Sequence, residues 1–362
     1  MPFTSEPPLH DPPTRVHGGP SVQELEALGL VPSDVLDFSV STNPYGPAPG
    51  VAAAIREAAI HLYPDPTCTL ARRRLGTHLG ISPGCLALGN GAADLLWVLA
   101  RTLLGPQKTL LLVEPTFCEL RVAATAAGAR IVEWRARSDD GFALHVDAIA
   151  DRARACRADV VYLCTPGVPT GAALAAGEVN RLADLVAPAH LVVDQSFLAL
   201  SERFADAAVA LRENAIAVRS LTKEHALPGV RVGYVVARES LVDQLDKQRP
   251  AWSTSAPAQA AVVAACAEEA FVAQNRQRLL EARAALAHAF LALGLRPVPS
   301  TANFFLLEGG QAAELRRRLL TRHRILVRDC TSFGLPRHIR IGSRMPEDNQ
   351  RLVGAIQLEL KS

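Results

Sequence analysis

The segment at 220–234 reads SLTKEHALPGVRVGY and closely follows an apolar run at 215–218 that is typical of a buried β-strand. A lysine is usually solvated on the protein surface, but Lys223 lies just beyond this expected strand. Ser220 stands three residues before it and Arg231 eight residues after it, in a loop punctuated by glycine. Such a loop can turn the lysine amine inward and place a hydroxyl and a guanidinium around one phosphate.

A lysine that forms a Schiff base with an aldehyde cofactor needs these companions, because pyridoxal phosphate carries both an aldehyde and a phosphate. The S-x-x-K pattern followed by G-x-R-x-G resembles the fold-type I, class I/II pyridoxal-phosphate enzymes. The resemblance implies pyridoxal 5'-phosphate as cofactor, Lys223 as the catalytic lysine, and Ser220 and Arg231 as cofactor ligands. It also implies an α/β fold of the PLP-dependent transferase type, with a large, mostly parallel sheet domain and a smaller α+β C-terminal domain.

The rest of the chain alternates β-rich and helix-compatible runs. Helix-compatible stretches at 146–154 and 175–185 indicate crossover connections, and together they predict a large cofactor-binding domain over 46–248. The β-rich runs are nearly all apolar, as expected for strands buried on both faces, and lie at 109–113, 131–134, 160–163, 191–193, 215–218 and 232–236.

A second, smaller domain is expected over 249–362. A long helical pattern of apolar residues runs over 279–293, and a shorter one at 312–323 lies among strand-like runs at 303–307, 325–329 and 338–341. The N-terminal arm, 1–45, is expected to associate with this domain. Its first residues are proline-rich and show no signal-peptide pattern.

Composition excludes several classes of protein. The 362 residues are 49% apolar and 20% charged, which predicts a globular chain, and the net charge of +2 does not favour nucleic acid as a partner. The longest apolar stretch, at 95–104, is broken by Arg101 and is too short to span a membrane. The seven cysteines are scattered without metal-ligand spacing, so we expect a reduced, cytoplasmic protein with no metal site.

Asp194 is the candidate partner of the cofactor ring nitrogen. It follows the apolar run at 191–193 and begins D-Q-S-F, which resembles the family pattern D-x-x-[FY]. A strand-end aspartate is more often a cap or turn residue. With Lys223 assigned, however, the resemblance implies that the buried Asp194 carboxylate keeps the ring nitrogen protonated through a charge-assisted hydrogen bond.

Three further segments resemble family elements around the cofactor. Gly91, Ala92 and Ala93 open a helical run and offer backbone N–H groups to the cofactor phosphate. Phe117, in E-P-T-F, resembles the aromatic residue that stacks on the pyridine ring, although a phenylalanine is commonly a core residue. Tyr63, in a Y-P pair, resembles the tyrosine that reaches the cofactor phosphate of a neighbouring subunit, which implies a homodimer with a shared active site.

The C-terminal run H-I-R-I-G-S-R alternates polar and apolar residues, so a strand would place Arg340 and Arg344 on one face. An ordinary edge strand with solvated cations has the same pattern. The resemblance implies that Arg340 clamps a substrate carboxylate, for which a planar guanidinium is suited. Arg344, His17 and Asn43 are candidates for residues near the substrate phosphate or along the substrate's approach, although a histidine in an arm is more often solvated.

Further motifs resemble the cobalamin-pathway L-threonine-O-3-phosphate decarboxylases, among them H-G-G at 17–19, S-T-N-P-Y-G-P at 41–47 and A-W-S at 251–253. That resemblance implies decarboxylation of L-threonine O-3-phosphate to (R)-1-amino-2-propanol O-2-phosphate. Histidinol-phosphate aminotransferases share the core motifs, so an aminotransferase acting on a phosphorylated amino acid is the alternative. A homologue that binds the cofactor without catalysis is a more remote one.

Two positions depart from the family pattern. The usual P-N-N-P-T-G loop reads P-G-V-P-T-G at 166–171, so Val168 replaces the asparagine that hydrogen-bonds the cofactor ring oxygen. Phe197 carries no hydroxyl that could replace it. We therefore expect that oxygen to have no side-chain donor at these two positions, which favours either a divergent decarboxylase or a relative with a changed reaction.

Overall fold

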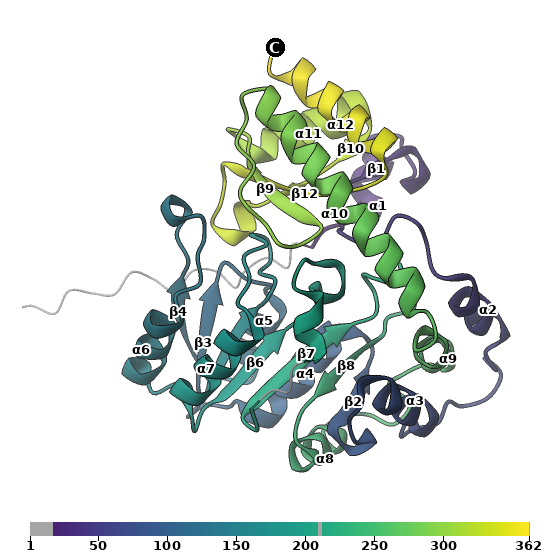
Figure 1. Cartoon of the computed structure of the whole chain (residues 1–362), viewed down its shortest axis with the longest axis vertical. Helices are drawn as coiled ribbons and strands as arrows, with labels where there is room; N and C mark the ends of the chain where they lie inside the picture. Colours follow the sequence, from purple (N-terminus) through teal and green to yellow (C-terminus); the bar gives the residue numbers. More distant parts are fainter. Residues whose placement is uncertain (1–16, 209–211, 362) are drawn as a thin grey trace, which may run out of the picture.

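The computed structural model of the chain describes residues 17–208 and 212–361. It has a larger part built on a seven-stranded sheet and a smaller part built on a three-stranded sheet (Figure 1). Residues 1–16, the proline-rich start of the arm, lie outside the described residues. The prediction that they form no signal peptide concerns this undescribed part.

The large sheet has the strand order β2-β8-β7-β6-β5-β3-β4. Strands β4, β3, β5, β6 and β7 are parallel, whereas β8 runs antiparallel to both β2 and β7. The α/β fold class with a mostly parallel sheet is therefore confirmed. The strands are β2 (Leu86–Gly89), β3 (Thr109–Glu114), β4 (Arg130–Arg135), β5 (Val160–Cys164), β6 (His190–Asp194), β7 (Ala215–Ser220) and β8 (Gly233–Val236).

Helices cover both faces of this sheet, which explains why its inner strands are apolar throughout. Along β3, Leu110 and Leu112 enter one core with the helices α4, α5 and α8, whereas Leu111 and Val113 enter the other with α6 and α7. This alternation is the two-residue period of a strand. The helices are α4 (Gly91–Leu103), α5 (Glu119–Ala126), α6 (Val146–Cys156), α7 (Ala176–Val186) and α8 (Glu239–Lys247).

The smaller part is an antiparallel sheet of order β11-β12-β9, packed against α10, α11 and α12. The run expected as one strand at 325–329 is divided, because β10 pairs with β1 of the N-terminal segment while β11 pairs with β12. The elements are β1 (Leu36–Asp37), β9 (Phe304–Glu308), β10 (Ile325–Leu326), β11 (Arg328–Asp329), β12 (His338–Gly342), α10 (Glu269–Ala292), α11 (Ala312–His323) and α12 (Pro346–Glu359).

The remaining helices are α1 (Val22–Ala27), α2 (Pro49–Glu57), α3 (Thr69–Leu79) and α9 (Ala256–Ala265). Within the described residues no helix is long and apolar enough to cross a bilayer by itself; α9 and α10 pass that test only as a pair bent by 83°. The N-terminal segment joins the smaller part, since Phe38 is fully buried in its core. The domain boundaries at 45/46 and 248/249 remain a prediction.

Candidate active site

A cavity of about 300 Å³ lies where the carboxyl ends of β6 and β7 meet the smaller part. Crevices at this edge of a parallel sheet are the usual ligand sites of open α/β folds. Asp194, Ser220 and Lys223 line it from the large sheet, and Arg340 lines it from β12. The cavity thus brings together residues that are far apart in the sequence.

Lys223 lies in the loop after β7, and two hydrogen bonds from Asn43 hold this loop. The backbone N–H of Asn43 donates to the Lys223 carbonyl at 2.8 Å, and its side-chain amide donates to the Glu224 carbonyl at 3.1 Å. The Lys223 amine lies 5.1 Å from the centre of the Phe197 ring. Burial, and then the cations Arg340 and Arg231, lower the pKa of Lys223 to about 8, so its amine is partly neutral near physiological pH.

Asp194 ends β6 and is buried, with 4% of its surface exposed. The Tyr162 hydroxyl donates to Asp194 Oδ2 at 3.2 Å, and the Ser196 backbone N–H donates to Oδ1 at 2.9 Å. Burial raises the pKa of Asp194, against the lowering effect of these hydrogen bonds and of Lys223. A buried, oriented carboxylate of this kind can hold a cationic ring N–H.

A cradle for an anion lies at the start of α4. Ala92, Ala93, Ser220 and Arg231 all line the cavity there. Gly91 has φ +85°, and a side chain at this position would overlap the Arg231 guanidinium. The backbone N–H groups and the positive end of this helix, together with a hydroxyl and a guanidinium, form a phosphate-type site.

The opposite end of the cavity carries two arginines from neighbouring strands. Arg328 on β11 lies directly opposite Arg340 on β12, and both are buried and line the cavity. The Arg340 guanidinium donates to the Ser39 carbonyl at 2.6 Å, while its buried Nε has no hydrogen-bond partner in the described structure. Burial lowers the pKa of Arg340 to about 10 and also lowers that of Arg328. Two desolvated cations side by side favour an anion between them.

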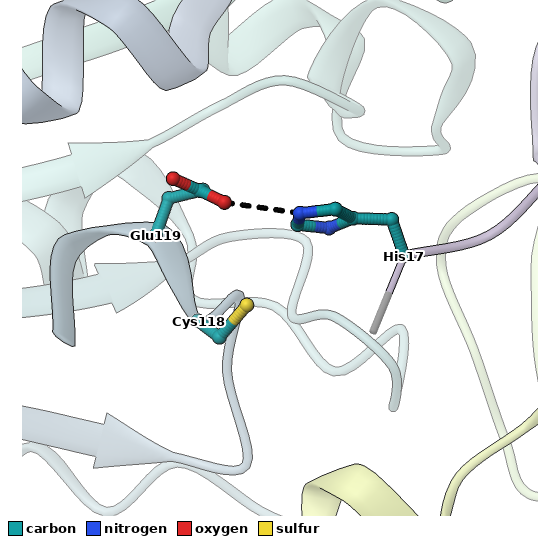
Figure 2. A group of neighbouring side chains, drawn as sticks. All are labelled: His17, Cys118 and Glu119. Carbon is teal, nitrogen blue, oxygen red and sulfur yellow. Dashed lines mark ion pairs between the residues drawn. The ribbon is translucent and has the colours of Figure 1, made fainter. Parts of the chain in front are cut away.

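His17 and Gly18 line the mouth of the same cavity. His17 Nε2 lies 3.0 Å from Oε1 of Glu119, and Figure 2 shows the two side chains pointing toward each other. The His17 ring centre lies 5.7 Å from that of Phe117. Cys118 is the third member of this group, whose possible ligand atoms all lie within 4.8 Å of one another. The scattered cysteine spacing did not indicate such a grouping, and the expectation of no metal site remains a prediction.

Four of the predicted residues are not among those that line this cavity in the described structure. Arg344 donates to Asp348 and to the Asp37 carbonyl. Its expected place beside Arg340 required a strand through 344, but β12 ends at Gly342, so the alternation does not reach Arg344.

The other three such residues are Gly91, which lies against the Arg231 guanidinium, Asn43, which holds the lysine loop, and Tyr63. Tyr63 is 81% exposed and its ring lies 4.7 Å from the ring of Trp252. A reach of Tyr63 into a neighbouring subunit remains a prediction.

Sequence reasoning missed Arg328, Glu119 and Tyr162. Arg328 lies in a run that was expected to be one strand, so its pairing opposite Arg340 was not visible. Glu119 begins α5, where an acidic residue usually signals only a helix start. Tyr162 lies within an apolar strand and looks like a core residue until its hydroxyl is seen on Asp194.

The two departures from the family pattern lie together in the cavity wall. Val168 and Phe197 both line the cavity and pack in one apolar cluster with Phe304. This wall is hydrophobic where the family pattern has a polar donor.

Comparisons with known proteins agree with this geometry. The family model described as aminotransferase class I and II matches residues 33–356. The chain is 33% identical over 350 residues to a histidinol-phosphate aminotransferase of Symbiobacterium thermophilum, covering 95% of each chain. A structure of histidinol-phosphate aminotransferase from Sinorhizobium meliloti in complex with pyridoxal-5'-phosphate has TM-score 0.85 and 25% identity, covering 95% of each chain. An L-threonine-O-3-phosphate decarboxylase from Porphyromonas gingivalis has TM-score 0.79 and 25% identity, covering 90% of this chain and 99% of its own.

These findings correct the expected reaction. The prediction of a threonine-phosphate decarboxylase is wrong, because the relative at 33% identity over nearly the whole chain is a histidinol-phosphate aminotransferase. The similar structure with the higher TM-score is also an aminotransferase. The H-G-G motif that favoured the decarboxylase therefore does not decide the reaction.

Proposed function

Because the chain belongs to the class I and II aminotransferase family, we propose that it is an aminotransferase of the histidinol-phosphate type, acting on a phosphorylated amino compound. The observation that carries the proposal is the pair Arg328 and Arg340, two buried guanidiniums that line the same cavity as Lys223. The Arg328 guanidinium donates to the Asp329 carbonyl and to Ser332 Oγ, and that of Arg340 donates to the Ser39 carbonyl. These bonds orient two cations whose remaining N–H groups suit phosphate oxygens.

Pyridoxal phosphate is the cofactor, and the residues in the cavity fit it. A phosphate fits the cradle of the α4 N-terminus, Ser220 and Arg231, where Gly91 leaves room for the guanidinium. A ring N–H fits the buried carboxylate of Asp194. The bound cofactor supplies an aldehyde that condenses with amines and a ring that accepts electrons released at the substrate Cα.

Lys223 and Asp194 divide the proton chemistry between them. Lys223 has a pKa lowered to about 8, so its amine can act as a nucleophile and can carry a proton to and from the substrate Cα. Asp194, oriented by the Tyr162 hydroxyl, would keep the ring nitrogen of the bound cofactor protonated. The apolar wall of Val168 and Phe197 excludes water from one side of the site.

A homodimer is part of the proposal. Exposed apolar side chains gather near Tyr63, whose ring contacts that of Trp252. A second copy of this chain would cover this surface, and Tyr63 would then be free to reach the partner's cofactor phosphate. Light scattering should give twice the mass of one chain. These exposed side chains are Tyr63, its sequence neighbours Ile60 and Leu62, and Trp252.

The proposal is tested by turnover of the cofactor-loaded protein. L-Histidinol phosphate with 2-oxoglutarate should give glutamate, and each substrate should be required. Release of CO2 from phosphothreonine without glutamate formation would contradict an aminotransferase. A protein that binds the cofactor but converts neither compound would instead be the non-catalytic homologue.

A further inference from the structure

Glu119 is a buried carboxylate in the cavity wall to which the proposed chemistry gives no task. Glu119 lies at the start of α5, and 6% of its surface is exposed. The Trp97 indole N–H donates to Glu119 Oε2 at 2.8 Å, which fixes the orientation of the carboxylate. The other oxygen, Oε1, points to His17 (Figure 2). A buried carboxylate is costly unless donors satisfy both oxygens, so an N–H group is needed at Oε1.

The strap of residues 17–19 supplies that group. The Gly19 backbone N–H donates to Ser39 Oγ at 2.7 Å, and a Cβ at Gly18 would lie 2.6 Å from the Ser39 carbonyl oxygen. The backbone therefore passes too close to Ser39 for any side chain at Gly18. This close approach brings His17 to the cavity, where it contacts the Glu119 carboxylate and lies near the Phe117 ring.

We propose that Glu119 is the subsite for the imidazole ring of the substrate, and that His17 occupies this subsite in the substrate-free protein. This inference rests on the proposed function, which requires a substrate with an amine, a phosphate and an imidazole. A substrate imidazole has the same N–H donor as His17 and finds the same aromatic neighbour and carboxylate acceptor.

The burial of the two partners supports an exchange between the rings. The His17 side chain is 45% exposed, whereas that of Glu119 is 7% exposed. His17 can therefore leave without uncovering a core, while Glu119 stays in place through Trp97. Glu119 selects the substrate imidazole, and His17 competes with that imidazole for the Glu119 carboxylate. The arginine pair binds the phosphate independently of both.

Two ligands separate ring recognition from phosphate recognition. L-Histidinol phosphate carries the ring, and 2-aminopropyl phosphate carries the amine and phosphate without it. Calorimetry on the cofactor-loaded protein gives the Kd of each. Glu119→Ala should weaken histidinol phosphate about tenfold or more and leave the ring-free compound within about twofold. His17→Ala should tighten histidinol phosphate several-fold, because it removes the competitor.

Two further variants serve as controls for folding and for the specificity of the effect. Glu119→Gln keeps an acceptor for Trp97 and should fold, and it should still lose part of the preference for the ring because the charge is gone. Asp140→Asn breaks a comparable pair, that of His145 and Asp140 at 3.0 Å on the surface, and should change neither Kd.

The inference is overturned if the Glu119 variants weaken both ligands equally, if His17→Ala weakens histidinol phosphate, or if the wild-type protein shows no preference for the ring. Turnover with 2-oxoglutarate is scored separately. Ring preference that depends on Glu119 without turnover would overturn the proposed function and leave the subsite standing. Turnover of histidinol phosphate with a ring preference that does not depend on Glu119 would overturn the subsite and leave the proposed function standing.

Discussion

The two ends of the cavity are built in different ways. At the cofactor end, Asp194 and Ser220 end neighbouring strands of one sheet, Lys223 lies in the loop after the second strand, and each lies within a short motif. At the substrate end, the strap, the start of α5 and the strands β11 and β12 come from three distant parts of the chain. The cofactor end depends on local sequence, whereas the substrate end depends on how those parts pack together.

This difference explains what could be predicted. The apolar strands and the lysine loop are local patterns, so the α/β fold and the residues of the cofactor end could be read from the sequence. Arg344 was placed wrongly beside Arg340 because nothing local shows that β12 ends at Gly342. Arg328 was missed because only the antiparallel register of β11 and β12 brings it opposite Arg340.

The largest expected effect is at the cofactor end. Lys223→Ala should lower kcat by about 1,000-fold or more, because no other lysine lines the cavity among the described residues. It should also abolish the visible absorption of the cofactor-loaded protein. Lys108→Ala, which removes a surface lysine paired with Asp159, is the matched control and should keep both. Full activity of the Lys223 variant would contradict the assignment of Lys223 as the catalytic lysine.

A smaller effect, on KM, distinguishes Arg328, which lines the substrate end, from Arg344, which lies outside the cavity. Arg328→Gln should raise KM for histidinol phosphate by about 10- to 100-fold, because hydrogen bonds between charged groups contribute about 1.5–3 kcal/mol. Arg344→Gln should change KM by less than about twofold, since its side chain is held by Asp348 outside the cavity. Steady-state kinetics on both variants decide the matter. The opposite order would restore the prediction made from the sequence.

The smallest expected effect is the influence of the Arg340 charge, at the substrate end, on the pKa of Lys223, at the cofactor end. Only the neutral amine of Lys223 would react with the aldehyde that the cofactor supplies, so the rate of cofactor capture by cofactor-free protein should rise with pH to a midpoint near 8. Arg340 is the second cause, after burial, that lowers this pKa. Arg340→Gln removes a cation, which favours the protonated amine, so the midpoint should move upward. Stopped-flow absorbance measures it; an unshifted midpoint would mean that the two ends are electrostatically independent.

The most direct test of the substrate end is a crystal structure of the cofactor-loaded protein with L-histidinol phosphate. The account predicts phosphate oxygens within about 3 Å of the guanidiniums of both Arg328 and Arg340. A phosphate bound at Arg344, or one that contacts neither member of the pair, would contradict it.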